Sequence, residues 1–153
     1  LPMPKVTELR NDAEIKNLAS FTSVMSINVG NPHCVLLVKE IPQNWQEIGS
    51  KIENMTHIFP HKTNVEFVRE LGNNAFEVLV WERGAGRTFA CGTGACGVAF
   101  AMVKNGLADS KHPIEIYMEG SKIYGNGKAI SVQLLENSIL MTNHAFFEGR
   151  IDV

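Results

Sequence analysis

The sequence predicts an α+β fold in which a curled, mostly antiparallel sheet is wrapped around a central, buried, apolar helix. Short segments with strand-like alternation, separated by glycine and asparagine turns, recur along most of the chain. One segment, Gly94–Val103, is apolar on nearly every side, and such a helix has to be enclosed. The chain has 153 residues with no long linker or repeat, so we expect one domain spanning residues 1–153.

The first half of the chain predicts two strands followed by a helix. Strands are expected over Ser23–Val29 and Cys34–Val38, with a turn at Asn31-Pro32 between them. Apolar residues at i, i+3, i+7 and i+10 lie on one face of a helix expected over Pro42–Met55, and they are Trp45, Ile48, Ile52 and Met55.

The middle of the chain predicts a hairpin and then the enclosed helix. The strands are Thr63–Glu70 and Phe76–Trp81, and Gly72-Asn73-Asn74 between them is a hairpin turn signal. A polar, glycine-containing loop, Glu82–Arg87, follows. The helix is expected over Thr93–Asn105, where Asn105-Gly106 ends it.

The last part of the chain predicts further strands. They are expected over Ile114–Met118, Lys128–Leu135 and Ser138–Thr142. Gly125-Asn126-Gly127 and Glu136-Asn137 are the turn signals between them.

Composition excludes several classes of protein. The net charge of −2 and the lack of basic runs argue against a nucleic-acid partner, and no apolar run approaches the ~18 residues of a membrane span. The three cysteines cannot all pair and show no zinc-site spacing, so we expect no metal site. Free thiols are typical of a cytoplasmic protein.

Cys91 is the candidate catalytic residue. It lies in a glycine-rich turn just before the enclosed helix, where unpaired N–H groups and the helix dipole favour a thiolate. We therefore expect the pKa of Cys91 to lie below the ordinary value of about 8.5, beside a place for a carboxylate or phosphate. Cys34 and Cys96 lie within apolar runs and are expected to be buried structural residues.

A nucleotide site is an alternative for the same residues. Gly92–Gly97 matches the G-x-G-x-x-G pattern of dinucleotide-binding proteins, and Ile114–Glu119 supplies a following strand and an acid. The fingerprint normally follows its strand directly, whereas about ten residues separate Trp81 from Gly92.

Four blocks, in order, resemble the C-terminal half of diaminopimelate epimerases: Gly30-Asn31-Pro32-His33, Thr63-Asn64-Val65-Glu66-Phe67, Trp81-Glu82-Arg83-Gly84-Ala85-Gly86 and Ala90-Cys91-Gly92-Thr93-Gly94. The resemblance implies an enzyme of two similar halves, each with a cysteine at a helix N-terminus. The two cysteines invert one α-carbon of diaminopimelate, between the LL and meso forms, in the biosynthesis of lysine and peptidoglycan precursors. One thiolate removes the α-proton and the other thiol protonates the opposite face, with no cofactor such as pyridoxal phosphate.

The resemblance also implies roles for individual residues. Cys91 matches the acid/base cysteine, and His33 matches a position that tunes a thiol or orients a neighbour. Six residues match substrate-binding positions: Asn31, Asn64, Glu82, Arg83, Gly92 and Thr93. Arg83 suits a carboxylate, which a guanidinium binds bidentately, and Glu82 suits an ammonium group.

The second cysteine motif of the family, of the Cys-Gly-Asn-Gly type, is absent from these 153 residues. We therefore expect the chain to be the C-terminal half, to pair with an N-terminal half, and not to epimerise alone. The family resemblance implies a homodimer for the full-length enzyme. A related racemase or isomerase, or a nucleotide-binding module of the same fold, remains the alternative.

Overall fold

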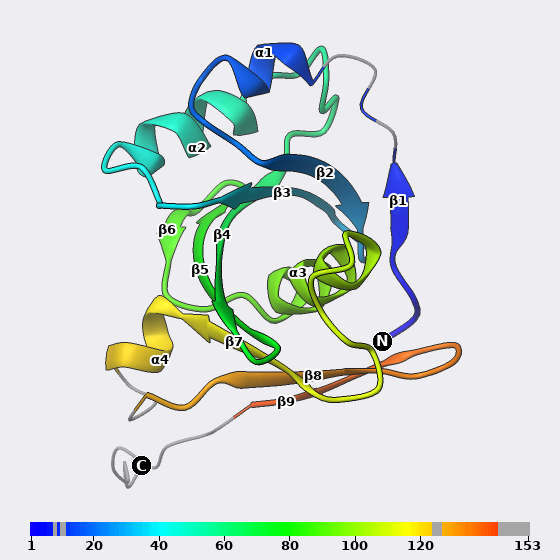
Figure 1. Ribbon diagram of the computed structural model, residues 1–153. Helices are drawn as coiled ribbons and strands as arrows, with labels where there is room; N and C mark the ends of the chain where they lie inside the picture. The colour runs from blue at the N-terminus through cyan, green and yellow to red at the C-terminus, as the bar shows by residue number, and fades with distance from the viewer. Residues whose placement is uncertain (8, 10–11, 124–126, 144–153) are drawn as a thin grey trace, which may run out of the picture.

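The sheet is curled around one helix, as the sequence predicts. The computed structural model describes residues 1–7, 9, 12–123 and 127–143. Figure 1 shows helix α3 (Gly92–Lys104) inside the curl of the sheet. Among the described residues, six of the eight strand pairs are antiparallel, which confirms a mostly antiparallel sheet.

The strands follow one path through the sheet, in the order β1-β2-β3-β4-β5-β7-β8-β9, with β6 (Gly86–Thr88) paired to β5 alone. Their bounds are β1 Lys5–Thr7, β2 Ser23–Asn28, β3 Pro32–Val38, β4 Asn64–Gly72, β5 Ala75–Glu82, β7 Ile114–Met118, β8 Ile130–Leu134 and β9 Ile139–Thr142.

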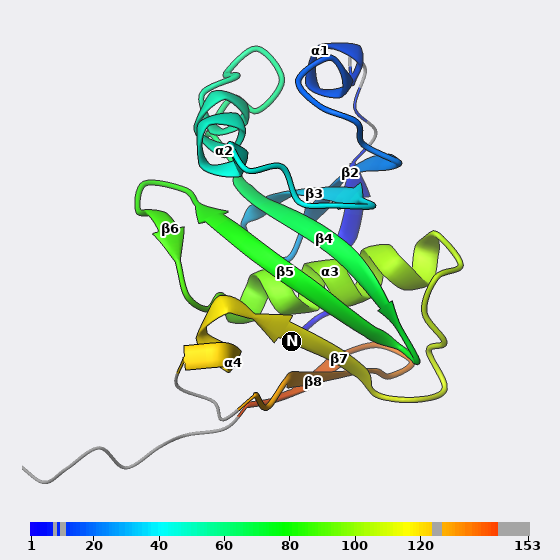
Figure 2. The same ribbon diagram turned by 60° about the vertical axis from the view of Figure 1, so that its left-hand side comes forward.

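Two pairs of strands are parallel, and a helix connects each pair. A parallel pair needs a long crossover connection, because the chain has to return to the same end of the sheet. Helix α2 (Trp45–Glu53) connects β3 to β4, and α3 connects β5 to β7. Figures 1 and 2 show α2 on the outer face of the sheet with α1 (Ala13–Lys16), and α3 on the inner face.

The two faces of the sheet bury two separate apolar cores. On β3, Val35 and Leu37 belong to the inner core around α3, whereas Cys34 and Leu36 belong to the outer core under α2. Side chains alternate along a strand, so a continuous apolar run is expected when both faces are covered. The outer core contains the predicted helix face, Trp45, Ile48, Ile52 and Met55.

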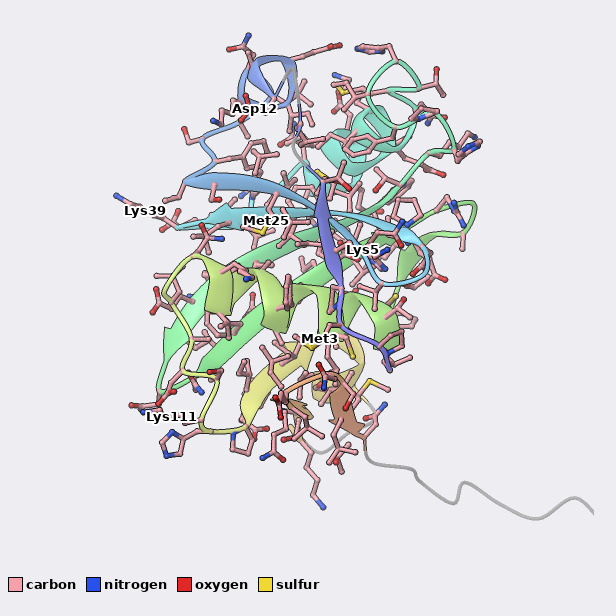
Figure 3. The ribbon with its side chains drawn as sticks, turned by 90° about the vertical axis from the view of Figure 1, so that its right-hand side faces the viewer. Met3, Lys5, Asp12, Met25, Lys39 and Lys111 are labelled. Carbon is pink, nitrogen blue, oxygen red and sulfur yellow. The ribbon has the colours of Figure 1, made fainter. Side chains whose placement is uncertain are left out.

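Helix α3 is enclosed over most of its length. Its residues from Gly94 to Met102 are all buried, which confirms the sequence prediction. Figure 3 shows the N-terminal segment with Met3 and Lys5 passing across α3, and Met3 packs against the inner core. The backbone N–H of Ile139 donates to the carbonyl of Leu1 at 2.7 Å, so this segment also contacts β9. A rigidly enclosed helix holds its N-terminus in a fixed position.

Every predicted strand and helix is present, with ends shifted by at most three residues. The hairpin turn is confirmed, since Asn73 and Asn74 have φ of 53° and 60° and join β4 to β5. The turn predicted at Gly125-Asn126-Gly127 lies mostly outside the described residues.

The sequence patterns missed four short elements. These are β1, α1, β6 and α4 (Glu119–Ile123), each three to five residues long. The sequence analysis found no apolar pattern in these segments, and β6 lies partly in the stretch predicted as a loop. Across the described part of the chain, no helix combines the length and apolar character needed to cross a membrane.

Candidate active site around Cys91

Cys91 is the N-cap residue of α3 and points its sulfur at the helix amides. Its extended backbone (φ −146°, ψ 108°) turns the side chain back over the first turn of the helix. The Gly94 N–H donates to Sγ at 3.3 Å, and the Thr93 hydroxyl lies 3.6 Å from Sγ. The predicted position of this thiol at the start of the helix is therefore confirmed, and the residue is partly buried against the edge of the inner core.

The thiol opens onto a surface pocket of about 660 Å³. The pocket is lined by Leu1, Glu82, Ala90, Cys91, Gly92, Thr93, Ile139, Leu140 and Met141. The N–H groups of Gly94 and Ala95 are bonded to Cys91 itself. Among the described residues, the N–H groups of Gly92 and Thr93 have no acceptor, as expected in the first turn of a helix. They are available to an anion in the pocket.

The expectation that the helix lowers the pKa of Cys91 is wrong for this chain. Burial raises the pKa of the thiol, and the Glu66 and Glu82 carboxylates raise it further. Hydrogen bonds from the Thr93 hydroxyl and the Gly94 N–H act in the opposite direction but are outweighed. Desolvation penalises the charged thiolate more than two hydrogen bonds stabilise it, so Cys91 rests as a thiol. Burial also raises the pKa of Cys34, and raises that of Cys96 to about 11.

A chain of side-chain hydrogen bonds leads from Cys91 to the interior. Thr93 Oγ1 lies 3.4 Å from Nδ2 of Asn31, and Oδ1 of Asn31 lies 3.0 Å from Nε2 of His33. The other ring nitrogen of His33, Nδ1, lies 2.6 Å from Oε1 of Glu66. Both His33 and Glu66 are fully buried. The predicted residues Asn31, His33, Thr93 and Cys91 are therefore brought together.

Glu66 is the residue that sequence reasoning missed. It lies on β4 two residues after Asn64, on the strand face that points toward α3. One signal was available, because an acidic residue occupied the middle of a strand between the apolar Val65 and Phe67. A buried carboxylate at such a position needs a partner, but the sequence does not identify the partner as His33.

Asn64 and Arg83 are separated from the thiol pocket. The buried Asn64 amide donates to the Pro32 carbonyl at 3.0 Å and accepts from the Arg83 N–H at 2.8 Å, so its side chain joins two loops. The Arg83 side chain lines a second pocket of about 620 Å³ and donates to the His61 carbonyl. Glu82 and Arg83 thus line different pockets.

The turn that contains Glu82 and Arg83 is anchored from α2. Both oxygens of the buried Glu53 accept hydrogen bonds at 2.8 Å, one from the Trp81 indole and one from the Gly84 N–H. Helix α2 approaches Trp81 closely at Gly49, where a Cβ would lie 2.7 Å from the Trp81 Cβ. The glycine and the carboxylate together fix the position of the turn.

The geometry does not favour the dinucleotide alternative. That fingerprint needs a tight turn from strand to helix, but β6 forms a hairpin with β5 between Glu82 and Gly92. The Cys91 sulfur also takes the Gly94 N–H. Within the described residues, no group of three or more His, Cys, Asp or Glu side chains is placed to hold a metal ion.

The family model and the curated relatives that match this chain carry the same description. A sequence model of the family described as diaminopimelate epimerase matches residues 25–144. The diaminopimelate epimerase of Bacteroides thetaiotaomicron is 43% identical over 129 residues, covering 82% of this chain and 45% of that protein. That of Acetivibrio thermocellus is 38% identical, and the match covers 85% of this chain and 45% of that protein. That of Methanococcus maripaludis is also 38% identical, and the match covers 83% of this chain and 44% of that protein. The chain thus spans a little under half the length of these curated relatives.

Solved structures share the fold at low sequence identity. A predicted epimerase from Pseudomonas aeruginosa aligns with a TM-score of 0.61 and 14% identity, covering 97% of this chain and 57% of that one. A phenazine biosynthesis protein of the PhzF family from Bacillus anthracis aligns with a TM-score of 0.54 and 19% identity, covering 74% of this chain and 35% of that one. At these identities the similarity concerns the fold alone.

Proposed function

The chain belongs to the diaminopimelate epimerase family, and we propose that it is the C-terminal half of an enzyme that inverts one α-carbon of diaminopimelate. The reaction interconverts the LL and meso forms and serves the supply of lysine and peptidoglycan precursors. One observation above all supports this role: the Cys91 sulfur lies at the N-terminus of α3 and opens onto a pocket that two unpaired N–H groups also reach.

Cys91 is one of two acid/base groups in this proposal. Removal of the α-proton breaks the Cα–H bond, forms an S–H bond on a thiolate, and leaves the electron pair on Cα, delocalised into the α-carboxylate. A thiol on the opposite face then returns a proton to Cα. The raised pKa of Cys91 suits the protonated, donating partner in the resting enzyme. The reverse reaction requires Cys91 as thiolate.

The N-terminus of α3 stabilises the charge that develops on the substrate. The free N–H groups of Gly92 and Thr93 bind the α-carboxylate, whose negative charge increases when the α-proton leaves. These donors are fixed by the enclosed helix, so they need no rearrangement as the charge develops. Exclusion of water by a covering half would strengthen the interaction.

The two pockets divide the recognition of a long substrate. Glu82 lines the thiol pocket and suits an ammonium group, whereas Arg83 lines the second pocket and suits a distant carboxylate. Asn31 contacts Thr93 of the thiol pocket and Asn64 accepts from the Arg83 backbone, so both amides are bonded within the protein before substrate binds. We assign both asparagines to substrate binding, with Asn64 also fixing the backbone of Arg83.

The remaining parts of the site are supplied by an N-terminal half. That half provides the second cysteine and covers the pocket, so this chain alone does not epimerise. The full-length enzyme forms a homodimer in the cytoplasm, where the three free thiols of this chain stay reduced.

Deuterium exchange tests the proposal. The chain is joined to an N-terminal half that contains the second cysteine, such as that of the Bacteroides thetaiotaomicron relative, and LL-diaminopimelate is supplied in D₂O. We expect the meso form with deuterium at Cα, no turnover by the 153-residue chain alone, and no turnover by Cys91→Ala. Cys96→Ala, a buried cysteine on the same helix, is the matched control and should retain activity. Inversion by the Cys91→Ala protein would refute the role of this thiol.

A further inference from the structure

We propose that Glu66 is a positioning residue for Cys91. By holding His33 as the doubly protonated imidazolium, it orients Asn31 so that the Thr93 hydroxyl is free to donate to the Cys91 sulfur. Glu66 touches neither the pocket nor the sulfur through a hydrogen bond, and it acts through the three side chains between them.

The first step is the buried pair itself. Oε1 of Glu66 lies 2.6 Å from Nδ1 of His33, and both side chains are 0% exposed. A carboxylate in this position accepts a hydrogen bond from the Nδ1–H group and stabilises positive charge on the ring. Within the described residues, Oε2 of Glu66 has no hydrogen-bond partner, so His33 is the group that compensates this carboxylate. An uncompensated carboxylate at this depth would be costly.

The second step is the direction of the hydrogen bonds. The Asn31 carbonyl oxygen, 3.0 Å from Nε2 of His33, accepts the second N–H of the imidazolium. The Asn31 amide nitrogen then faces Thr93 Oγ1 at 3.4 Å and donates to it. Thr93 has one hydroxyl hydrogen, which is left for the sulfur of Cys91 at 3.6 Å. A hydrogen bond donated to sulfur favours the thiolate.

The opposite direction of the same chain favours the thiol. If His33 is neutral and protonated on Nδ1 alone, Nε2 accepts from the Asn31 amide, which must turn over. Asn31 then accepts from the Thr93 hydroxyl, and Thr93 accepts the S–H of Cys91. Both arrangements hold the same number of protons when Cys91 is thiolate in the first and thiol in the second. The charge state of His33 therefore shifts the balance between thiol and thiolate at Cys91, which burial holds on the thiol side in the resting protein.

A direct electrostatic effect of Glu66 on Cys91 can be distinguished from an effect that acts through His33, because the two change the pKa of Cys91 in opposite directions. The titratable groups that act on Cys91 and its network are Glu66 on β4, Glu82 at the end of β5, His33 on β3 and Cys96 on α3. The amino group of Leu1 acts on Cys96, and Leu1 lines the same pocket as Cys91. Nearby, Arg87 is paired with Glu119. As a bare negative charge, Glu66 disfavours the thiolate, so its removal would lower the pKa of Cys91. If Glu66 acts through His33, its removal raises the pKa of Cys91.

The unmodified 153-residue chain provides the first test. Nitrogen-15 NMR of the histidine rings at pH 7 should show both nitrogens of His33 protonated. A neutral ring with one bare nitrogen would overturn the inference without any variant. In Glu66→Gln, which keeps the size of the side chain, His33 should become neutral.

Alkylation of Cys91 by iodoacetamide, followed against pH by mass spectrometry, provides the second test. We expect Glu66→Gln to react about tenfold more slowly near pH 8, which corresponds to a rise of about one pKa unit. Thr93→Val should slow the reaction as well, and Glu66→Gln should add nothing in the Thr93→Val background. Glu70→Gln removes the same charge at an exposed position of β4 and should have no effect. Faster or unchanged alkylation of Glu66→Gln would refute the inference.

This inference rests on the proposed function for its role in catalysis, but neither readout needs turnover. If Cys91→Ala abolishes inversion while Glu66→Gln leaves the alkylation profile unchanged, the proposed function stands and this inference fails. If the titrations behave as expected while Cys91→Ala still inverts the substrate, the hydrogen-bond chain is real and the proposed function fails.

Discussion

Replacement of Gly94 by alanine tests the close packing behind the thiol. A Cβ at this position would lie 2.9 Å from Oε1 of Glu66 and 3.2 Å from Sγ of Cys91. The carboxylate cannot move away easily, because it is buried and bonded to His33 at 2.6 Å. We therefore expect Gly94→Ala to destabilise the fold, although alanine is the better helix former.

The size of the effect follows from two opposing contributions. Alanine in place of a helical glycine stabilises by up to about 1 kcal/mol. Forcing a methyl group into a packed site costs about 1–3 kcal/mol. Gly97 is a control on the same helix, since a Cβ there meets its nearest atom, on Val29, at an ordinary 3.4 Å. The helix preference is similar in the two variants, so Gly94→Ala should be about 1–3 kcal/mol less stable than Gly97→Ala.

Thermal and urea unfolding followed by circular dichroism measure this difference. For a domain of this size it corresponds to a difference in Tm of about 2–12 °C. Alkylation of Cys91 should change only in Gly94→Ala, because the added methyl group contacts its sulfur. If Gly94→Ala proved as stable as Gly97→Ala, the space between α3 and Glu66 would be larger than the structure indicates.

Three further predictions concern stability. Glu53→Gln should lower the free energy of unfolding, measured in urea, by about 1–3 kcal/mol. The glutamine amide has one oxygen and cannot accept from both the Trp81 indole and the Gly84 N–H. The exposed Glu47→Gln is the control and should change it by no more than about 0.5 kcal/mol. Burial raises the pKa of Cys34, so this thiol ionises first in the unfolded chain. Above about pH 8.5 it should lower the free energy of unfolding by about 1.4 kcal/mol per pH unit, in addition to the contributions of Cys91 and Cys96; an equal slope in Cys34→Ala would contradict this. Asn73 has a φ of 53°, which a β-branched side chain disfavours, so Asn73→Val should lower the free energy of unfolding by about 1–2 kcal/mol. Asn73→Gly is the control and should have nearly the same free energy of unfolding as the original chain.

Periodicity and turn residues were sufficient to predict most of the fold. The strands at Ser23–Asn28 and Ile114–Met118 and the helix over Gly92–Lys104 depend on local apolar patterns that few alternatives satisfy. The outer position of α2 was not predicted. Nothing in an amphipathic helix specifies which face of which sheet it covers, and that follows only from the crossover between the parallel strands β3 and β4.

The candidate site was predicted in part. Cys91 could be placed at the start of α3 because glycines and an apolar run follow it in the sequence. The sequence could not give the rise of its pKa, since that rise depends first on burial of the sulfur in the folded protein and then on the charges of Glu66 and Glu82 from two other strands. The separation of Glu82 from Arg83 into two pockets was equally invisible, because it depends on how the turn is anchored by Glu53.

The sequence by itself determined the curled sheet, the enclosed helix and the family, because each depends on patterns between residues that are near in the chain or that occur in a fixed order. Only the tertiary structure decided the chemistry of the thiol. Burial of the sulfur sets its charge first, and the Thr93 hydroxyl and the carboxylates of Glu66 and Glu82 act on it as well. The inner partner of its hydrogen-bond chain is His33, which is paired with Glu66. Electrostatic energies depend on distances and burial in space, and Cys91, Glu66 and His33, which are far apart in the chain, acquire those distances only when the sheet closes around the helix.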